Sequence, residues 1–89
     1  MSTELKPYFM IYSLEMCPYC ERAEHLARSN NLRHKVQHIL QRDKHEWKQR
    51  LEASTFPQIY YYDGDGKFYI GGCRDFEELL RKNLPIVKS

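Results

Sequence analysis

The sequence predicts an α/β fold whose elements follow the order β-α-β-α-β-β-α and form a four-stranded mixed sheet flanked by helices. Short aromatic and β-branched runs alternate with amphipathic patterns, which is typical of strands alternating with helices. The last two strand-like runs are separated by a short segment rich in Asp and Gly, a strong hairpin signal. The 89 residues allow one small domain with a modest core, so we predict a single domain over residues 1–89.

The first half of the chain predicts a strand, a helix and a second strand. Residues 8–13 are aromatic and β-branched without charges, which predicts a buried strand. Residues 18–30 begin with a proline, carry an apolar stripe and end near Asn30, which predicts a helix. Residues 34–40 suit a second strand. A right-handed crossover through the helix makes these two strands parallel.

A second helix follows in the sequence. Asp43 can cap it, and Trp47 and Leu51 lie on one of its faces. The helix is expected to end before Pro57, because the residue preceding a proline disfavours helical backbone angles. We interpret Trp47 as a core anchor.

The C-terminal part predicts a hairpin and a last helix. Residues 58–62 and 67–70 are strand-like and flank Asp63-Gly64-Asp65-Gly66, so they are expected to pair antiparallel. Asp75 to about Asn83 predicts a helix with Phe76, Leu79 and Leu80 on one face, closed by Pro85. Helices would then cover both faces of the sheet.

Two cysteines lie where the first strand gives way to the first helix, in Cys17-Pro18-Tyr19-Cys20. A helix that begins at Pro18 directs unpaired backbone N–H groups and a partial positive charge at Cys17, which favours the thiolate. Cys17 is therefore the predicted nucleophile. Cys20 lies one helical turn further in, so we predict that it is more buried and acts as the resolving thiol.

Two other interpretations of this cysteine pair are weaker. A structural zinc site needs four ligands, and the chain offers one pair, a distant Cys73 and four histidines without finger spacing. A structural disulfide across two residues would constrain little unfolded-chain entropy.

Composition limits the compartment and the partners. The odd count of three cysteines indicates a reducing compartment. No run approaches the roughly 20 apolar residues that cross a bilayer, and the first residues contain no signal core, so we expect a soluble, cytoplasmic monomer. The formal charge of +2, with its basic cluster interleaved with acids, argues against nucleic-acid binding.

Three separated motifs together resemble the dithiol, CPYC-type glutaredoxins of the thioredoxin-like fold family. They are Cys17-Pro18-Tyr19-Cys20, Thr55-Phe56-Pro57-Gln58-Ile59 and Ile70-Gly71-Gly72-Cys73-Arg74-Asp75. The resemblance covers nearly all of the chain.

This resemblance implies how glutathione would bind. Pro57 would be cis, and the Phe56 backbone would pair with the cysteinyl part of glutathione like an added strand. Backbone amides after Gly72 would hold the γ-glutamyl carboxylate, while the Asp75 carboxylate would face the γ-glutamyl ammonium or cap its helix. Cys73 is interpreted as a backbone contributor rather than a third redox thiol. The glutathione-binding residues so implied are Tyr19, Thr55, Phe56, Pro57, Gly72, Cys73, Arg74, Asp75 and Lys44.

Lys44 enters because the chain departs from the family's pattern. Many glutaredoxins place a lysine or arginine three residues before the first active-site cysteine, where this chain has Leu14, followed by Glu15. A cation of the second helix would have to neutralise the glycyl carboxylate of glutathione. Lys44 ranks first, ahead of Lys48 and Arg42.

The resemblance implies an enzyme, a glutathione-dependent thiol–disulfide oxidoreductase. Cys17 would attack protein disulfides or glutathione mixed disulfides, with glutathione as co-substrate and no metal. Glutathionylated or disulfide-containing proteins, ribonucleotide reductase among them, would be the partners. Two alternatives stay open: an electron donor reduced by thioredoxin reductase, and a non-enzymatic iron–sulfur cluster carrier.

Overall fold

The computed structural model describes residues 6–82. Its elements are β1 (Tyr8–Leu14), α1 (Pro18–Ser29), β2 (His34–Ile39), the 3₁₀ helix η1 (Gln41–Asp43), α2 (Lys44–Leu51), β3 (Gln58–Asp63), β4 (Gly66–Gly71) and α3 (Cys73–Arg81). The predicted order β-α-β-α-β-β-α is confirmed. No helix within residues 6–82 has the length and apolar character to span a membrane.

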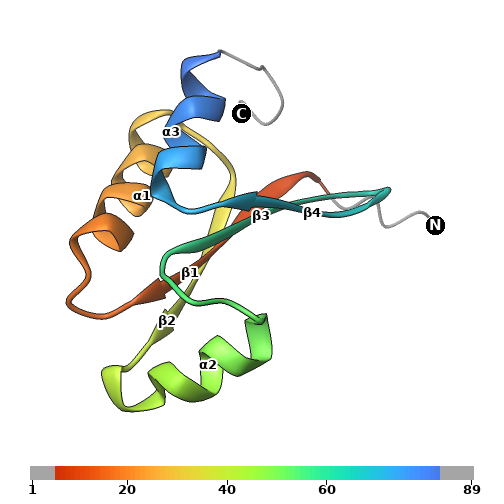
Figure 1. Ribbon diagram of the computed structural model, residues 1–89. Helices are drawn as coiled ribbons and strands as arrows, with labels where there is room; N and C mark the ends of the chain where they lie inside the picture. Colours follow the sequence, from red (N-terminus) through yellow and green to blue (C-terminus); the bar gives the residue numbers. More distant parts are fainter. Residues whose placement is uncertain (1–5, 83–89) are drawn as a thin grey trace.

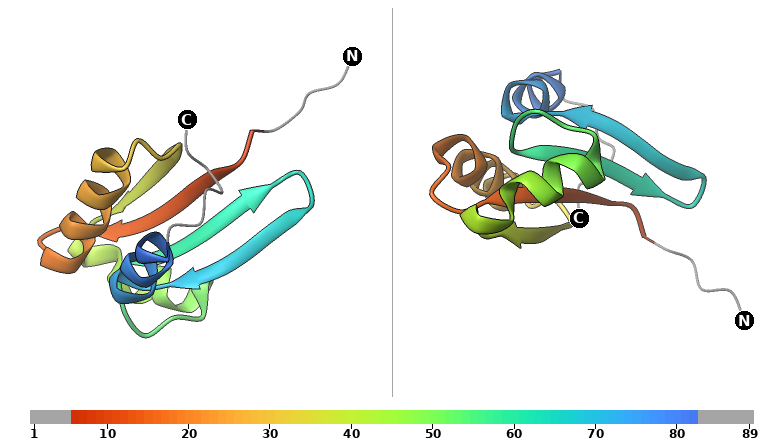
Figure 2. Two further views of the ribbon diagram at one scale, coloured as in Figure 1. Left: turned by 90° about the horizontal axis from the view of Figure 1, so that it is seen from above. Right: turned by 60° about the horizontal axis from the view of Figure 1, so that its bottom comes forward.

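The four strands form one mixed sheet in the order β2-β1-β3-β4 (Figure 2). Strand β1 is parallel to β2 and antiparallel to β3, and β3 is antiparallel to β4. The predicted parallel pair and hairpin are therefore confirmed. In the register of β1 and β2, Ser13 lies beside His38.

Helices α1 and α3 cover one face of the sheet, and α2 lies on the opposite face (Figure 1). The residues of β1 alternate, so that Phe9, Ile11 and Ser13 are all buried beneath α1 and α3. The larger hydrophobic cluster on this face contains Phe9, Ile11, Ala23, Ala27, Leu32, Ile59, Cys73 and Phe76. The thiol of Cys73 is thus part of the core.

A second hydrophobic cluster contains Cys20 and packs against Cys17. Its buried residues are Leu14, Cys20 and Ile39, and partly buried Trp47 and Phe56 pack against it. Trp47 also contacts the ring of Tyr12, with centroids 5.8 Å apart. Trp47 is therefore the core anchor that the sequence predicts, and it fixes α2 beside the thiols.

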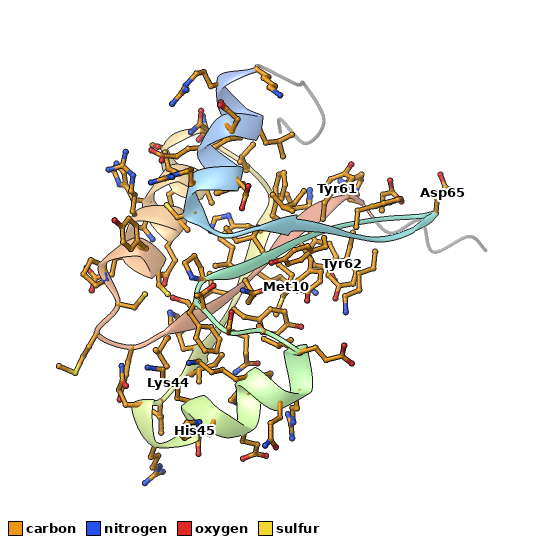
Figure 3. All side chains as sticks on the ribbon, viewed as in Figure 1. Met10, Lys44, His45, Tyr61, Tyr62 and Asp65 are labelled. Carbon is orange, nitrogen blue, oxygen red and sulfur yellow. The ribbon has the colours of Figure 1, made fainter. Side chains whose placement is uncertain are left out.

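The hairpin of β3 and β4 turns through Gly64 and Asp65, since Asp63 is paired with Gly66. The Asp63 carboxylate accepts hydrogen bonds from the backbone N–H of Asp65 at 2.7 Å and of Gly66 at 3.1 Å. Figure 3 shows Asp65 at the hairpin tip, which extends beyond the helices. Asp63 therefore acts as a local turn acceptor.

Two helix starts differ from the predictions. Asp43 precedes α2 but makes no side-chain capping bond, because η1 runs directly into the helix and leaves Asp43 at φ −100° and ψ 7° instead of the extended conformation of a cap. Helix α3 begins at Cys73, two residues before the predicted start. The predicted end near Asn83 and the closing Pro85 lie outside the described residues.

Candidate active site

Cys17 lies at the junction of the loop after β1 with the beginning of α1. It is the N-cap residue of α1, with φ −123° and ψ 108°, and Pro18 follows in the first helical turn. The backbone N–H of Cys20 donates to Cys17 Sγ at 3.3 Å. Cys17 is only partly buried. The thiol thus lies at an accessible helix N-terminus, as the sequence predicts, where a backbone N–H stabilises negative charge on sulfur.

Cys20 differs sharply in its environment. Its side chain is fully buried, and its Sγ accepts a hydrogen bond from the Leu14 backbone N–H at 3.3 Å. Burial, reinforced by the neighbouring Cys17 thiol, raises the pKa of Cys20 to about 12. Cys20 therefore stays protonated across the neutral range, and the predicted difference in burial between the two thiols is confirmed.

A pocket of about 320 Å³ lies at the start of α3; we call it the α3 pocket. The peptide bond between Phe56 and Pro57 is cis, as the resemblance implies, and the Cys17 thiol donates weakly to the Phe56 carbonyl at 3.9 Å. The residues that line the α3 pocket are Tyr19, Thr55, Phe56, Pro57, Gly72, Cys73, Arg74 and Asp75. The structure thus brings together all the predicted glutathione-binding residues except Lys44.

The backbone at the rim of the α3 pocket depends on glycine and on Asp75. Gly71 has φ +127°, and a Cβ there would overlap the Asp75 side chain. Asp75 Oδ2 accepts the Gly72 N–H at 3.1 Å. The capping role of Asp75 is therefore present, while its carboxylate remains exposed on the pocket wall.

A second pocket of about 280 Å³, the α2 pocket, adjoins Cys17 from the side of α2. It is lined by Leu14, Cys17, Lys44, Lys48, Ser54, Thr55 and Phe56. Figure 3 shows Lys44 in the first turn of α2. Both lysines are half-buried, and neither forms an ion pair within residues 6–82. The α2 pocket therefore carries two uncompensated cations beside the thiol.

Two neighbouring charges do not line the α2 pocket. Arg42 is exposed and is not part of its wall. The Glu15 carboxylate accepts the backbone N–H of Gln41 at 2.9 Å at the start of η1, so it is engaged away from the pocket. Lys44 and Lys48 are thus better placed than Arg42 to replace the cation that Leu14 lacks.

Cys73 lines the α3 pocket, but its side chain belongs to the core. Only 5% of Cys73 is exposed, and burial raises the pKa of its thiol. A buried, protonated thiol is a poor nucleophile. This geometry fits the interpretation of Cys73 as a backbone contributor.

Sequence reasoning missed Ser54, which lines the α2 pocket, and two residues behind Cys20. Ser13 is buried on β1 and donates to the Glu24 carboxylate of α1 at 2.5 Å. The signal was available, because Glu24 lies four residues after Cys20 and so on the same helix face. Within residues 6–82, no group of three or more His, Cys, Asp or Glu side chains could hold a metal ion.

Comparison with known proteins matches residues 9–68 of the chain to the glutaredoxin family model. The chain belongs to the glutaredoxin family. It is 30% identical over 86 residues to glutaredoxin 1 of Rickettsia prowazekii, a match that covers 92% of this chain and 86% of the relative. As a member of the family, with two neighbouring thiols at the start of α1, it is a thiol–disulfide oxidoreductase.

Solved glutaredoxin structures share its fold. Glutaredoxin 1 from Francisella tularensis, in complex with cacodylate, superposes with a TM-score of 0.66 at 27% identity and covers 85% of this chain and 94% of its own. The buckwheat glutaredoxin–glutathione complex gives a TM-score of 0.62 at 21% identity, covering 91% and 76%. These structures confirm a thioredoxin-like arrangement of the four-stranded mixed sheet and three helices.

Proposed function

We propose that this glutaredoxin uses glutathione as its reductant, with Cys17 as nucleophile and Cys20 as resolving thiol of a dithiol mechanism. The observation that carries the proposal is that Cys17 lines the α2 pocket and contacts the carbonyl of Phe56, which together with Thr55 also lines the α3 pocket. A ligand seated across both pockets would present its sulfur to Cys17.

Glutathione matches the chemistry of the two pockets. It carries a carboxylate at each end and a thiol between them. The backbone amides at the start of α3 suit the γ-glutamyl carboxylate, because a helix N-terminus favours an anion. Lys44 and Lys48 of the α2 pocket suit the glycyl carboxylate. The buckwheat family member in complex with glutathione supports the choice of ligand.

The proposed reaction proceeds by thiol–disulfide exchange. The Cys17 thiolate attacks a disulfide sulfur and forms a mixed disulfide, while the other sulfur leaves as a thiolate. With a glutathionylated substrate, a glutathione thiolate then releases Cys17. With a protein disulfide, Cys20 attacks Cys17 Sγ, releases the reduced protein and leaves a Cys17–Cys20 disulfide that glutathione reduces.

An assay coupled to NADPH and glutathione reductase tests this proposal. The substrates are a glutathionylated peptide and a disulfide-bonded protein, each assayed with the unsubstituted chain and with Cys20→Ser. We expect Cys20→Ser to keep turnover of the glutathionylated peptide and to lose reduction of the protein disulfide, since only the latter needs an intramolecular thiol.

The reductant is tested by exchanging the coupling system. Replacing glutathione and its reductase by thioredoxin reductase should stop turnover. Turnover that continues with thioredoxin reductase and is absent with glutathione would overturn the glutathione assignment and favour the alternative reductant.

A further inference from the structure

A line of hydrogen-bonding groups connects the buried Cys20 thiol with the surface. Hydrogen bonding by Ser13 lowers the pKa of the Cys20 thiol, against the larger effect of burial, and the Ser13 hydroxyl donates to Glu24 Oε2 at 2.5 Å. Glu24 Oε1 lies 3.5 Å from His38 Nε2, and the side chains of Glu24 and His38 are 17% and 72% exposed. The line therefore runs from a fully buried sulfur to a carboxylate at the edge of the solvent.

Three elements place these groups together. Cys20 and Glu24 lie four residues apart in α1 and so share one helix face. Ser13 follows Phe9 and Ile11 on the face of β1 that packs beneath α1, where an apolar residue would be expected. The parallel register puts His38 of β2 next to Ser13. A buried polar pair such as the Ser13 hydroxyl and the Glu24 carboxylate, at a position that is otherwise apolar, indicates a structural or catalytic role.

The resolving step needs such a pair, because the buried thiol must lose a proton. Cys20 must give up its proton to attack the mixed disulfide on Cys17, yet burial raises its pKa to about 12. Loss of the proton to solvent at neutral pH would leave only a very small thiolate fraction. The Leu14 N–H helps to stabilise the thiolate once it forms, but it cannot accept the proton.

We propose that Glu24, acting through the Ser13 hydroxyl, accepts the proton of Cys20 as Cys20 attacks the mixed disulfide on Cys17. This inference rests on the proposed function, because it needs Cys20 as the resolving thiol. The Cys20 proton moves to Ser13 Oγ while the Ser13 proton moves to Glu24 Oε2. The sulfur electron pair forms the bond to Cys17 Sγ, and the other sulfur of the mixed disulfide leaves with the electrons of the broken bond.

Three elements supply the groups that contact the Glu24 carboxylate. Arg28 of α1 approaches Oε1 at 4.0 Å, and His38 of β2 approaches it at 3.5 Å. Ser13 of β1 donates to the other oxygen. Because Oε1 lies on the exposed side, Glu24 can return its proton to solvent after each turnover.

The transfer has a distinctive dependence on pH. A direct transfer of the proton from Cys20 to Glu24 neither takes up nor releases a proton, so the rate by this route does not vary with pH. Loss of the same proton to solvent instead makes the thiolate about tenfold scarcer for each pH unit below the thiol pKa. The slope of the rate against pH separates the two routes.

The resolving step can be followed with dithiobis(nitrobenzoate) by stopped-flow absorbance. The first thionitrobenzoate is released when Cys17 attacks the reagent, and the second when Cys20 attacks the mixed disulfide on Cys17. All chains carry Cys73→Ser so that the third thiol is silent. Glu24→Gln is the key variant, because the amide oxygen still accepts the Ser13 hydrogen bond but does not take up a proton.

We expect Glu24→Gln to leave the first release unchanged and to slow the second by about a hundredfold at neutral pH, a typical contribution of general base catalysis. The second release should be nearly flat with pH in the parent and rise about tenfold per pH unit in Glu24→Gln. Ser13→Ala should behave in the same way. Glu78→Gln, which removes a carboxylate from the exposed pair with Arg81 on α3, is the matched control and should match the parent.

A second release in Glu24→Gln that keeps the parent's pH dependence, slowed or not, would reduce Glu24 to a structural role and overturn the inference. Absence of the second release in the parent would overturn both this inference and the resolving role of Cys20. A normal second release in the parent and in Glu24→Gln would reject the proton transfer alone. Glu24→Gln decides the question even if Ser13→Ala does not fold.

Discussion

Cys17 and Cys20 lie within one helical turn, yet the two thiols have opposite environments. Cys17 is partly exposed at the N-terminus of α1 and lines the α2 pocket, whereas Cys20 is fully buried in a cluster with Leu14 and Ile39. In the proposed mechanism, the helix start makes the Cys17 sulfur the nucleophile, and burial in the core keeps Cys20 protonated until the resolving step. Two chemically identical side chains therefore take different roles because one helical turn carries the second into the core.

The largest effect is expected from removing the accessible thiol. Cys17→Ser should abolish turnover of every disulfide substrate, because a serine hydroxyl cannot perform thiol–disulfide exchange. Serine remains a good N-cap residue, so the fold should be preserved. NADPH consumption in the coupled assay measures this loss, with circular dichroism as the control for folding. Substantial turnover by Cys17→Ser would break the assignment of Cys17 as nucleophile.

The second prediction concerns alkylation of the two thiols. Burial raises the pKa of Cys20 to about 12, so its thiolate at neutral pH is roughly a thousandfold scarcer than that of an ordinary thiol, before steric protection is counted. Iodoacetamide should therefore modify Cys17 at least a hundredfold faster than Cys20 in the folded chain.

Because a raised thiol pKa keeps the proton bound until alkaline pH, the reactivity of Cys20 should rise from neutral pH toward a pH of about 12. Peptide mass spectrometry after timed alkylation measures both rates. Similar alkylation rates for the two cysteines at neutral pH, in protein shown to be folded, would contradict the difference in environment between Cys17 and Cys20.

A several-fold effect is expected in the α2 pocket. Lys44→Gln and Lys48→Gln should raise the KM for glutathione, most of all when combined, because they remove the two pocket cations that we propose pair with its glycyl carboxylate. Added salt should shrink the difference from the parent, since it screens the charges. Arg42→Gln makes the same charge change outside the pocket and is the matched control. An unchanged KM in the double variant would reject the proposal that Lys44 and Lys48 supply the positive charge that is missing at Leu14.

The smallest effect is expected at Cys73. Cys73→Ser should change KM and kcat by no more than about twofold, because the contribution of this residue to the α3 pocket comes from its backbone. Its buried thiol packs within the core, so thermal unfolding is the sharper readout and should show a modest loss of stability. Inactivity comparable to that of Cys17→Ser would make Cys73 a redox thiol after all.

The sequence predicted the backbone frame of this site better than its side-chain details. The helix start at Pro18, the Asp-Gly hairpin and the cis Pro57 follow from local residue chemistry or from family motifs. All eight residues of the α3 pocket were predicted to bind glutathione, because they lie within the three family motifs. The sequence already ranked Lys44 first, and the structure adds that Lys48 lines the same α2 pocket while Arg42 does not, which depends on where α2 begins.

The remaining surprises come from contacts between distant elements. Asp43 does not cap α2, since η1 precedes the helix without a break. Glu15 is bound by Gln41 and does not face the α2 pocket. The bond from Ser13 to Glu24 joins β1 to α1 through the core, and only the packed arrangement brings the two together.

Mapping the site of glutathione attachment tests the central claim most directly. Cys20→Ser protein is exposed to oxidised glutathione, digested without reductant and analysed by mass spectrometry. The proposed mechanism predicts one glutathione per chain, attached to Cys17, because the mixed disulfide forms there and no resolving thiol removes it. An adduct found mainly on Cys73 would contradict the proposed mechanism. So would the absence of any adduct on folded protein whose Cys17 thiol is shown to be free.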